Sequence, residues 1–204
     1  MKLKALLRKD LYVLGKQGVF LLVITVAFAA IPTGYFNTFA ILFASIIPFS
    51  VINDDERTHW GRMAAMMPYS TRDMVLGKYV FGWLCIGAAV VLSGLLQMAL
   101  SLVVDRVFLP GVMVLSVLGA VCILAISLPL MFRMGVEKGR LAMFLVIFLV
   151  CGAAGAIAHI AESVGSGTVF AFQGPVLGVT LLAALVLTAV SVPLSMRFYT
   201  KRQS

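Results

Sequence analysis

The chain has 204 residues, of which 62% are hydrophobic and 12% are charged. A soluble domain is roughly 45–50% apolar and about 25% charged, so this composition excludes a water-soluble globular fold and indicates an integral membrane protein. The net charge of +8 does not indicate nucleic-acid binding. The basic residues lie at the ends of apolar runs, where they anchor membrane spans to an anionic surface.

The first segment, residues 2–16, predicts a helix that lies in the membrane interface. Leucines recur along it at helical spacing, and lysines and arginines occupy other positions of the helix. A basic amphipathic helix of this kind lies on the bilayer surface and leads the chain into it. The leucines are Leu3, Leu6, Leu7, Leu11 and Leu14, and the basic residues are Lys2, Lys4, Arg8, Lys9 and Lys16.

The next run, residues 18–52, is almost wholly apolar. As a single helix it would be about 50 Å long, against a hydrocarbon core of about 30 Å, so it must fold back. The sequence Pro32-Thr33-Gly34 is the natural break and predicts two spans, 17–34 and 36–52. A re-entrant pair is the alternative. Pro48 is expected to kink the second of these segments.

The longest polar interval of the chain runs from Asn53 to Tyr79. Asn53 and Glu56 have the spacing of a capping box that would open a short helix. An apolar stripe follows at helical spacing, formed by Trp60, Met63, Ala64 and Met67, and Pro68 would end this helix. Alternatively, the interval is a solvated loop with an interfacial tryptophan.

A second capping box, Ser70 with Asp73, opens the helix of the third span. Four further spans are predicted, over 78–103, 112–132, 141–160 and 175–196. The fold class is therefore all-α: a polytopic membrane protein with six transmembrane helices. All but one of the 16 Lys and Arg residues lie on one side of this topology, and Arg106 is the exception. Basic loops stay in the cytoplasm, so both termini and residues 53–77 are expected there.

Several function classes do not fit this sequence. The predicted spans carry no Lys, Arg, Asp or Glu near their centres, which argues against a carrier driven by an ion gradient. No phosphate-binding GxxxxGK[ST] motif and no hydrolase motif occurs, so the chain is not expected to be an enzyme. Cys85, Cys122 and Cys151 each lie alone in a different apolar run, so we expect neither a metal site nor a disulfide.

Two polar loops carry a resemblance to a known family. Pro68, Ser70, Val75, Lys78 and Tyr79 match the pattern of the cytoplasmic loop in small six-span type-2 ABC transporter permeases. The segment from Arg133 to Arg140, after Pro129-Leu130, is similar to their second loop, with Met134 in place of an aromatic residue. Together with the topology, the likeness covers the whole chain and is strongest to bacterial exporters of amphipathic peptides.

The resemblance implies the membrane subunit of an ATP-driven exporter in a bacterial cell membrane. Two such chains would form a homodimer, surrounded by membrane lipid, and would bind separate cytoplasmic ABC ATPase subunits. Those subunits would bind ATP and Mg²⁺, and this chain would bind no cofactor. The helix at about 54–67 would be the coupling helix of the cytoplasmic loop 53–77. The substrate would be an amphipathic peptide or a small hydrophobic compound.

On this hypothesis, the apolar anchors that dock in a groove of the ATPase are Trp60, Met63 and Met67. Charged residues would surround them, which is a common interface layout. The corner at Pro68 and Ser70 would pass the movement into the third span. The expected coupling residues are Asp54, Asp55, Glu56, Arg57, Trp60, Arg62, Met63, Met67, Pro68, Ser70 and Arg72. The expected residues of the second cytoplasmic loop are Arg133, Glu137, Lys138 and Arg140.

Two rival functions remain. A lipid-modifying membrane enzyme would need intramembrane carboxylates or histidines, which the predicted spans lack near their centres. A non-transporting scaffold, sensor or immunity protein that binds an ATPase could use the same cytoplasmic helix.

Polar residues within spans mostly satisfy a neighbouring backbone or bridge helices. Here these residues are Asn37, Ser93, Gln97, Ser101, Ser127, Thr180 and Ser191.

Overall fold

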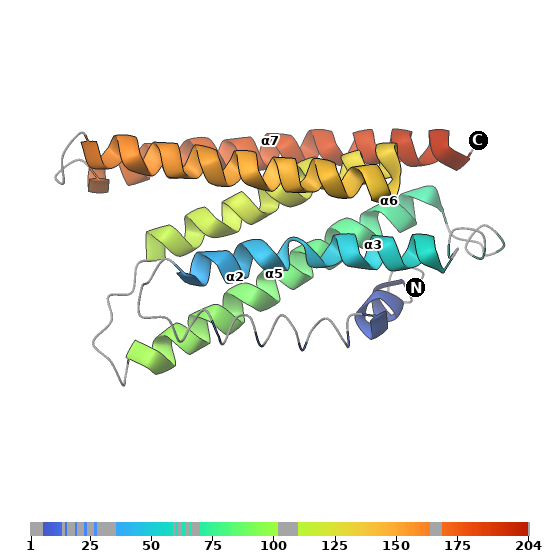
Figure 1. The fold of residues 1–204 in the computed structure, drawn as a ribbon, viewed down its shortest axis with the longest axis horizontal. Coiled ribbons are helices and arrows are strands. Elements are labelled where there is room, and N and C mark those ends of the chain that lie inside the picture. The colour runs from blue at the N-terminus through green and yellow to red at the C-terminus, as the bar shows by residue number, and fades with distance from the viewer. Residues whose placement is uncertain are drawn as a thin grey trace.

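The computed structural model of the chain is helical wherever it shows regular structure (Figure 1). It describes residues 6–13, 15, 19, 23, 27, 36–58, 60, 63, 66, 70–101, 110–163 and 169–203. The all-α prediction is therefore confirmed for the described part of the chain. Most of the predicted span 17–34, including its break at Pro32-Thr33-Gly34, lies outside the described residues.

The predicted span 36–52 is divided into two helices, α2 (Phe36–Ala44) and α3 (Ile47–Arg57). Pro48 lies in the first turn of α3, where its missing N–H costs nothing because that position has no helical acceptor. The Ser45 hydroxyl donates to the Leu42 carbonyl at 2.6 Å and so satisfies one of the last carbonyls of α2. Proline thus starts a new helix here instead of kinking a continuous one.

The end of α3 differs from the sequence prediction. The helix continues through Arg57, so Asn53 lies inside it and is not the N-cap of a separate coupling helix. The predicted capping box with Glu56 is therefore wrong. Helix α3 ends at Thr58, whose hydroxyl donates to the Asp54 carbonyl at 2.8 Å and so satisfies one of the last carbonyls of the helix. The acidic run is thus the last turn of a helix that begins among buried apolar residues.

Helix α5 (Thr71–Ser101) begins directly after Ser70, as the second capping box predicts. The Arg72 backbone N–H donates to the Ser70 hydroxyl at 3.3 Å, which satisfies one of the free amides of the first turn. The helix therefore begins at Thr71 and contains most of the predicted third span, 78–103.

Helix α6 (Pro110–Ser163) reverses direction at Gly135, whose φ of 79° lies in the left-handed region that favours glycine (Figure 1). A Cβ added to Gly139 would lie 3.1 Å from the Met131 Cα atom. In a straight helix these residues would be about 12 Å apart, so the two halves of α6 fold back on each other. These halves contain the predicted spans 112–132 and 141–160.

The last helix, α7 (Val169–Gln203), packs mainly against α6. Helix α2 lies between α5 and α6, and the core there is built from Ile41, Leu124 and Leu128. Large apolar side chains on the outer faces of α6 and α7 are exposed, among them Phe148 and Leu185. Apolar outer faces suit a lipid environment.

Three helical segments of the described residues are long and apolar enough to cross a membrane: Arg72–Ala99, Met113–Gly135 and Gly178–Thr200.

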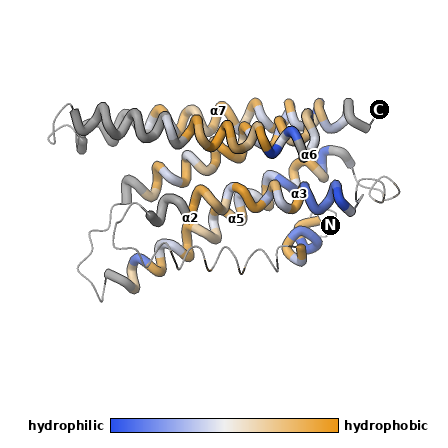
Figure 2. Tube along the Cα trace, in the orientation of Figure 1, coloured by the Kyte–Doolittle hydropathy of each residue, from blue (hydrophilic) through white to orange (hydrophobic). Residues whose placement is uncertain are grey.

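One end of the bundle gathers five parts of the chain (Figure 1): the helical segment 6–13, the end of α3, the start of α5, the α6 reversal and the end of α7. Hydrophilic residues gather at this end, which we call the charged end (Figure 2).

Candidate functional site at the charged end

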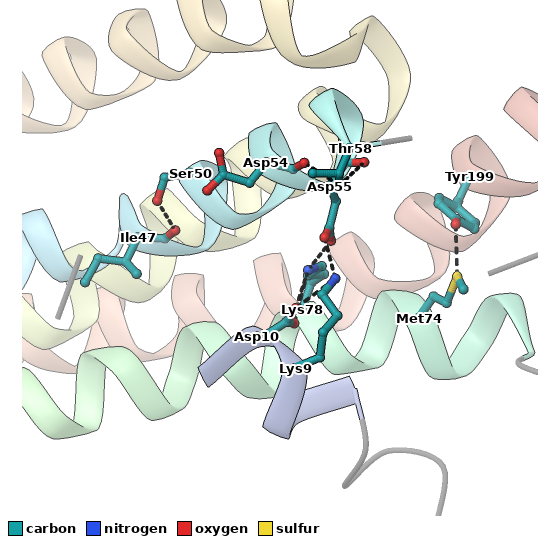
Figure 3. Close-up of polar contacts among 10 residues, drawn as sticks. All are labelled: Lys9, Asp10, Ile47, Ser50, Asp54, Asp55, Thr58, Met74, Lys78 and Tyr199. Carbon is teal, nitrogen blue, oxygen red and sulfur yellow. Dashed lines mark hydrogen bonds and ion pairs between the residues drawn. The ribbon is translucent and has the colours of Figure 1, made fainter. Parts of the chain in front are cut away.

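Four charged side chains from three separate segments meet at the charged end (Figure 3). Lys78, in the second turn of α5, places its Nζ atom 2.7 Å from Asp55 Oδ2 and 3.0 Å from Asp10 Oδ1. Lys9 binds the other oxygen of Asp55 and lies 3.3 Å from Asp10 Oδ1. We call Lys9, Asp10, Asp55 and Lys78 the charge network.

The charge network is shielded from solvent to different degrees. The Asp10 side chain is 4% exposed and that of Lys78 is 12% exposed, whereas Asp55 and Lys9 are 18% and 22% exposed. Its two lysines balance its two aspartates. An ion this buried is tolerated only with its partner in place. The network therefore fixes the segment 6–13 over the junction of α3 and α5.

Trp60 lies under the charge network, in the loop segment between α3 and α5, in which Trp60 and Met63 have helical backbone. The Lys9 Nζ atom lies 4.4 Å from the centre of its ring, a distance at which the cation and the ring attract each other. Further along the loop the apolar side chains turn to solvent: Met63 is 52% exposed and Met66 is 86% exposed. The loop thus holds Trp60 against the bundle and presents Met63 and Met66 outward.

A second set of contacts lies between the start of α5, the reversal of α6 and the end of α7. The Tyr199 hydroxyl donates to the Met74 sulfur at 3.0 Å (Figure 3), and its ring packs edge-on against Phe132 at 5.6 Å. Beside it, the Arg133 guanidinium lies 5.4 Å from the centre of the Phe198 ring. The first turns of α5 are therefore held to α3 and segment 6–13 by charges, and to α7 by the hydrogen bond between Tyr199 and Met74. The aromatic contacts join α7 to α6.

The sequence was compared with models of known protein families, and one of them matches almost the whole chain. A family model described as "ABC-2 family transporter protein" matches residues 5–200. The chain belongs to the ABC-2 transporter family. No curated protein and no solved structure matches it. Members of this family are multi-pass permease subunits without an ATPase domain, so the chain is the membrane component of a transporter, as its resemblance to type-2 permeases implied.

The expected coupling residues of this ABC-2 permease are not gathered in one place. Asp55 joins the charge network and Trp60 lies under Lys9. Asp54 and Glu56 are half-buried on the last turn of α3. The exposed members are Arg57, Met63, Ser70 and Arg72, and the members Arg62, Met67 and Pro68 lie outside the described residues.

The second loop lies on both sides of the Gly135 reversal. Arg133, Lys138 and Arg140 are exposed, and the Glu137 side chain lies outside the described residues. Together these cations make the reversal strongly basic. No group of three potential metal-binding His, Cys, Asp or Glu side chains converges within the parts of the chain that the structure describes.

Sequence reasoning missed that Asp10 is part of this site. It assigned Lys9 to the basic face of an interfacial helix and Lys78 to a loop motif, without relating either to Asp55. The signal available was Asp10 itself, which is the only acidic residue before Asp54 in the sequence. A single acidic residue in a basic segment indicates a specific ion pair, and the structure shows that its partner is Lys78.

Proposed function

We propose that this ABC-2 permease is the membrane subunit of an ATP-driven exporter and that its α3–α5 loop receives movement from separate cytoplasmic ATPase subunits. The observation that carries the proposal is the position of Met63 and Met66. They lie exposed on the loop whose two flanking helices are joined by the charge network. A partner that moves these side chains would move the start of α5.

The exposed methionines suit a docking role. Methionine is flexible and polarisable, so it fills grooves of irregular shape, and an apolar anchor with a charged rim is a common interface design. Arg57 and Arg72 are exposed on either side of the loop and supply such a rim. The Trp60 ring already contacts the Lys9 ammonium group. We therefore assign the anchors to Met63 and Met66, and not to Trp60. Met67, the remaining predicted anchor, lies outside the described residues.

The proposal includes a membrane topology. The charged end would face the cytoplasm, because basic residues concentrate there and basic loops stay inside. Six spans would result: 17–34, the α2–α3 pair, α5, the two halves of α6, and α7. Two copies of the chain would form a homodimer in a bacterial cell membrane.

Energy and substrate follow from the same proposal. ATP and Mg²⁺ would be bound by the partner ATPase and not by this chain. The transported molecule would be an amphipathic peptide or a small hydrophobic compound, as the resemblance to bacterial peptide exporters implies.

The test is co-reconstitution of the chain with ABC ATPase subunits in proteoliposomes, followed by ATP-driven uptake of a fluorescein-labelled amphipathic helical peptide. Met66→Asp should weaken ATPase binding by about tenfold or more, as expected for loss of an apolar anchor. The matched control is Met134→Asp, since Met134 is 45% exposed at the same end but on the α6 reversal.

Three outcomes are informative. Loss of ATPase binding in Met66→Asp alone supports the coupling loop. Equal binding by both variants and the unaltered chain overturns it. Normal ATPase binding by the unaltered chain without any peptide uptake favours the scaffold, sensor or immunity alternative over transport of this substrate class.

A further inference from the structure

A buried chain of hydroxyl groups joins α5, α6 and α7. The Tyr79 hydroxyl of α5 lies 2.8 Å from Ser195 Oγ of α7 and also hydrogen-bonds Ser191 Oγ. Ser191 Oγ donates in turn to the backbone carbonyl of Ala125 in α6. None of these four residues is more than 4% exposed. The hydroxyl chain, as we call these four residues, therefore links all three helices that carry candidate membrane spans.

The Ala125 carbonyl has a particular reason to need a donor. Pro129 lies inside α6, four residues further on, and has no N–H to donate to that carbonyl. An unpaired carbonyl in a membrane interior costs several kcal/mol, and serine hydroxyls from neighbouring helices are one way to satisfy it. Ser191 takes this role from α7.

The direction of each hydrogen bond follows from the Ala125 carbonyl, which can only accept. Ser191 has a single hydroxyl proton and gives it to that carbonyl, so Tyr79 must donate to Ser191. Tyr79 has then used its own proton, so Ser195 must donate to Tyr79. The hydroxyl chain therefore runs from Ser195 to Ala125, and Tyr79 is its central member.

Tyr79 directly follows Lys78 of the charge network. Successive residues of a helix point about 100° apart, so one turn of α5 presents Lys78 to α3 and Tyr79 to α6 and α7. We propose that Tyr79 is the positioning residue through which movement of α5 reaches α6 and α7 during transport. This inference rests on the proposed function, because it assumes that the charged end is the part that a partner moves.

The first experiment tests the hydroxyl chain without any ATPase. Ser191→Ala should lower the thermal midpoint of unfolding in detergent micelles by several degrees, because the Ala125 carbonyl loses its donor. Pro129→Ala restores a backbone N–H at that place, so Ser191→Ala should cost clearly less in a Pro129→Ala background. Ser127→Ala is the matched control. Ser127 lies in α6 and is buried like Ser191, but its hydroxyl has no hydrogen-bond partner among the described residues.

An equal loss from Ser191→Ala in both backgrounds would overturn the role given to the hydroxyl chain. So would a loss as large from Ser127→Ala. This experiment gives its answer whether or not the chain transports anything.

The second experiment tests the positioning role of Tyr79 in the co-reconstituted transporter. Tyr79→Phe keeps the ring and removes the hydroxyl. The amount of labelled peptide transported per ATP hydrolysed should fall at least about fivefold, because losing one hydrogen bond changes an equilibrium by about that factor and the Tyr79 hydroxyl makes two. ATP hydrolysis itself should stay nearly unchanged, because the charge network and the loop remain intact.

A purely structural role for Tyr79 would lower peptide transport and ATP hydrolysis in the same proportion, and that result would overturn the proposal. No change in either would also overturn it. If the unaltered chain carries no ATP-driven transport at all, the proposed function fails. The comparison of the Ser191 and Pro129 variants then still decides the hydroxyl chain.

Discussion

The charged end and the apolar middle of this ABC-2 permease are held together by different forces. At the charged end, ion pairs join segments that are far apart in the chain, such as Asp10 and Lys78. In the middle, helices meet by close packing: a Cβ added to Gly82 would lie 2.7 Å from a Leu124 methyl group. Packing of this kind allows little sliding. At the charged end, each of the two lysines contacts both aspartates, so a shift of one segment can redistribute these contacts without breaking all of them. The charged end is therefore suited to move when a partner binds, and the apolar middle is suited to transmit that movement between helices.

Removing one cation of the charge network should have the largest effect. Lys78→Met removes one of the two cations that Asp10 and Asp55 share, and breaking a buried pair in this way costs about 3–5 kcal/mol. Lys9 still neutralises part of the charge, so we expect the lower end of that range. The measurement is the unfolding midpoint in detergent micelles, from circular dichroism.

Lys138→Met is the matched control for this variant, because Lys138 is exposed at the same end of the bundle. An exposed cation contributes about 0–1 kcal/mol. Similar midpoints for the two variants would mean that the charge network does not hold segment 6–13 against α3 and α5.

Filling the close approach in the apolar middle should have the next largest effect. Gly82→Val would place methyl groups against Leu124 and Pro48, whose nearest atoms lie 2.7 Å and 3.2 Å from the added Cβ. Overpacking of a well-packed core costs about 1–3 kcal/mol. The control on the same helix is Gly87→Val, because nothing lies within 4 Å of a Cβ at Gly87. If Gly87→Val lowers the midpoint as much, helix propensity and not close packing explains the loss.

The sequence predicted the parts of this architecture that depend on local patterns. Hydrophobic runs predicted the helices, the Ser70 cap predicted where α5 begins, and the glycine-containing loop 133–140 predicted the reversal of α6. It also indicated that polar residues inside spans satisfy a neighbouring backbone, which Ser191 confirms. Local patterns suffice for these features because each depends on residues a few positions apart.

Pairings between distant residues could not be read in the same way. Asp10 and Lys78 are separated by 68 positions, and Tyr79 and Ser195 by 116. The length of α3 was also mispredicted, because Asn53 and Glu56 fit a helix start as well as the last turns of a helix. Only the packing of α3 against α5 and α6 decides between the two.

Two buried serines of the bundle provide the smallest expected effect and the finest comparison. Ser127 is fully buried in α6, and its hydroxyl has no hydrogen-bond partner among the described residues. Ser127→Ala removes a polar group whose desolvation is not repaid, so the midpoint should stay unchanged or rise, with a gain below about 1 kcal/mol after the small cavity is counted. Ser191→Ala, in contrast, should lower it, because the Ala125 carbonyl loses its donor. A clear loss from Ser127→Ala would mean that its hydroxyl has a partner in the membrane, and the contrast between the two serines would disappear.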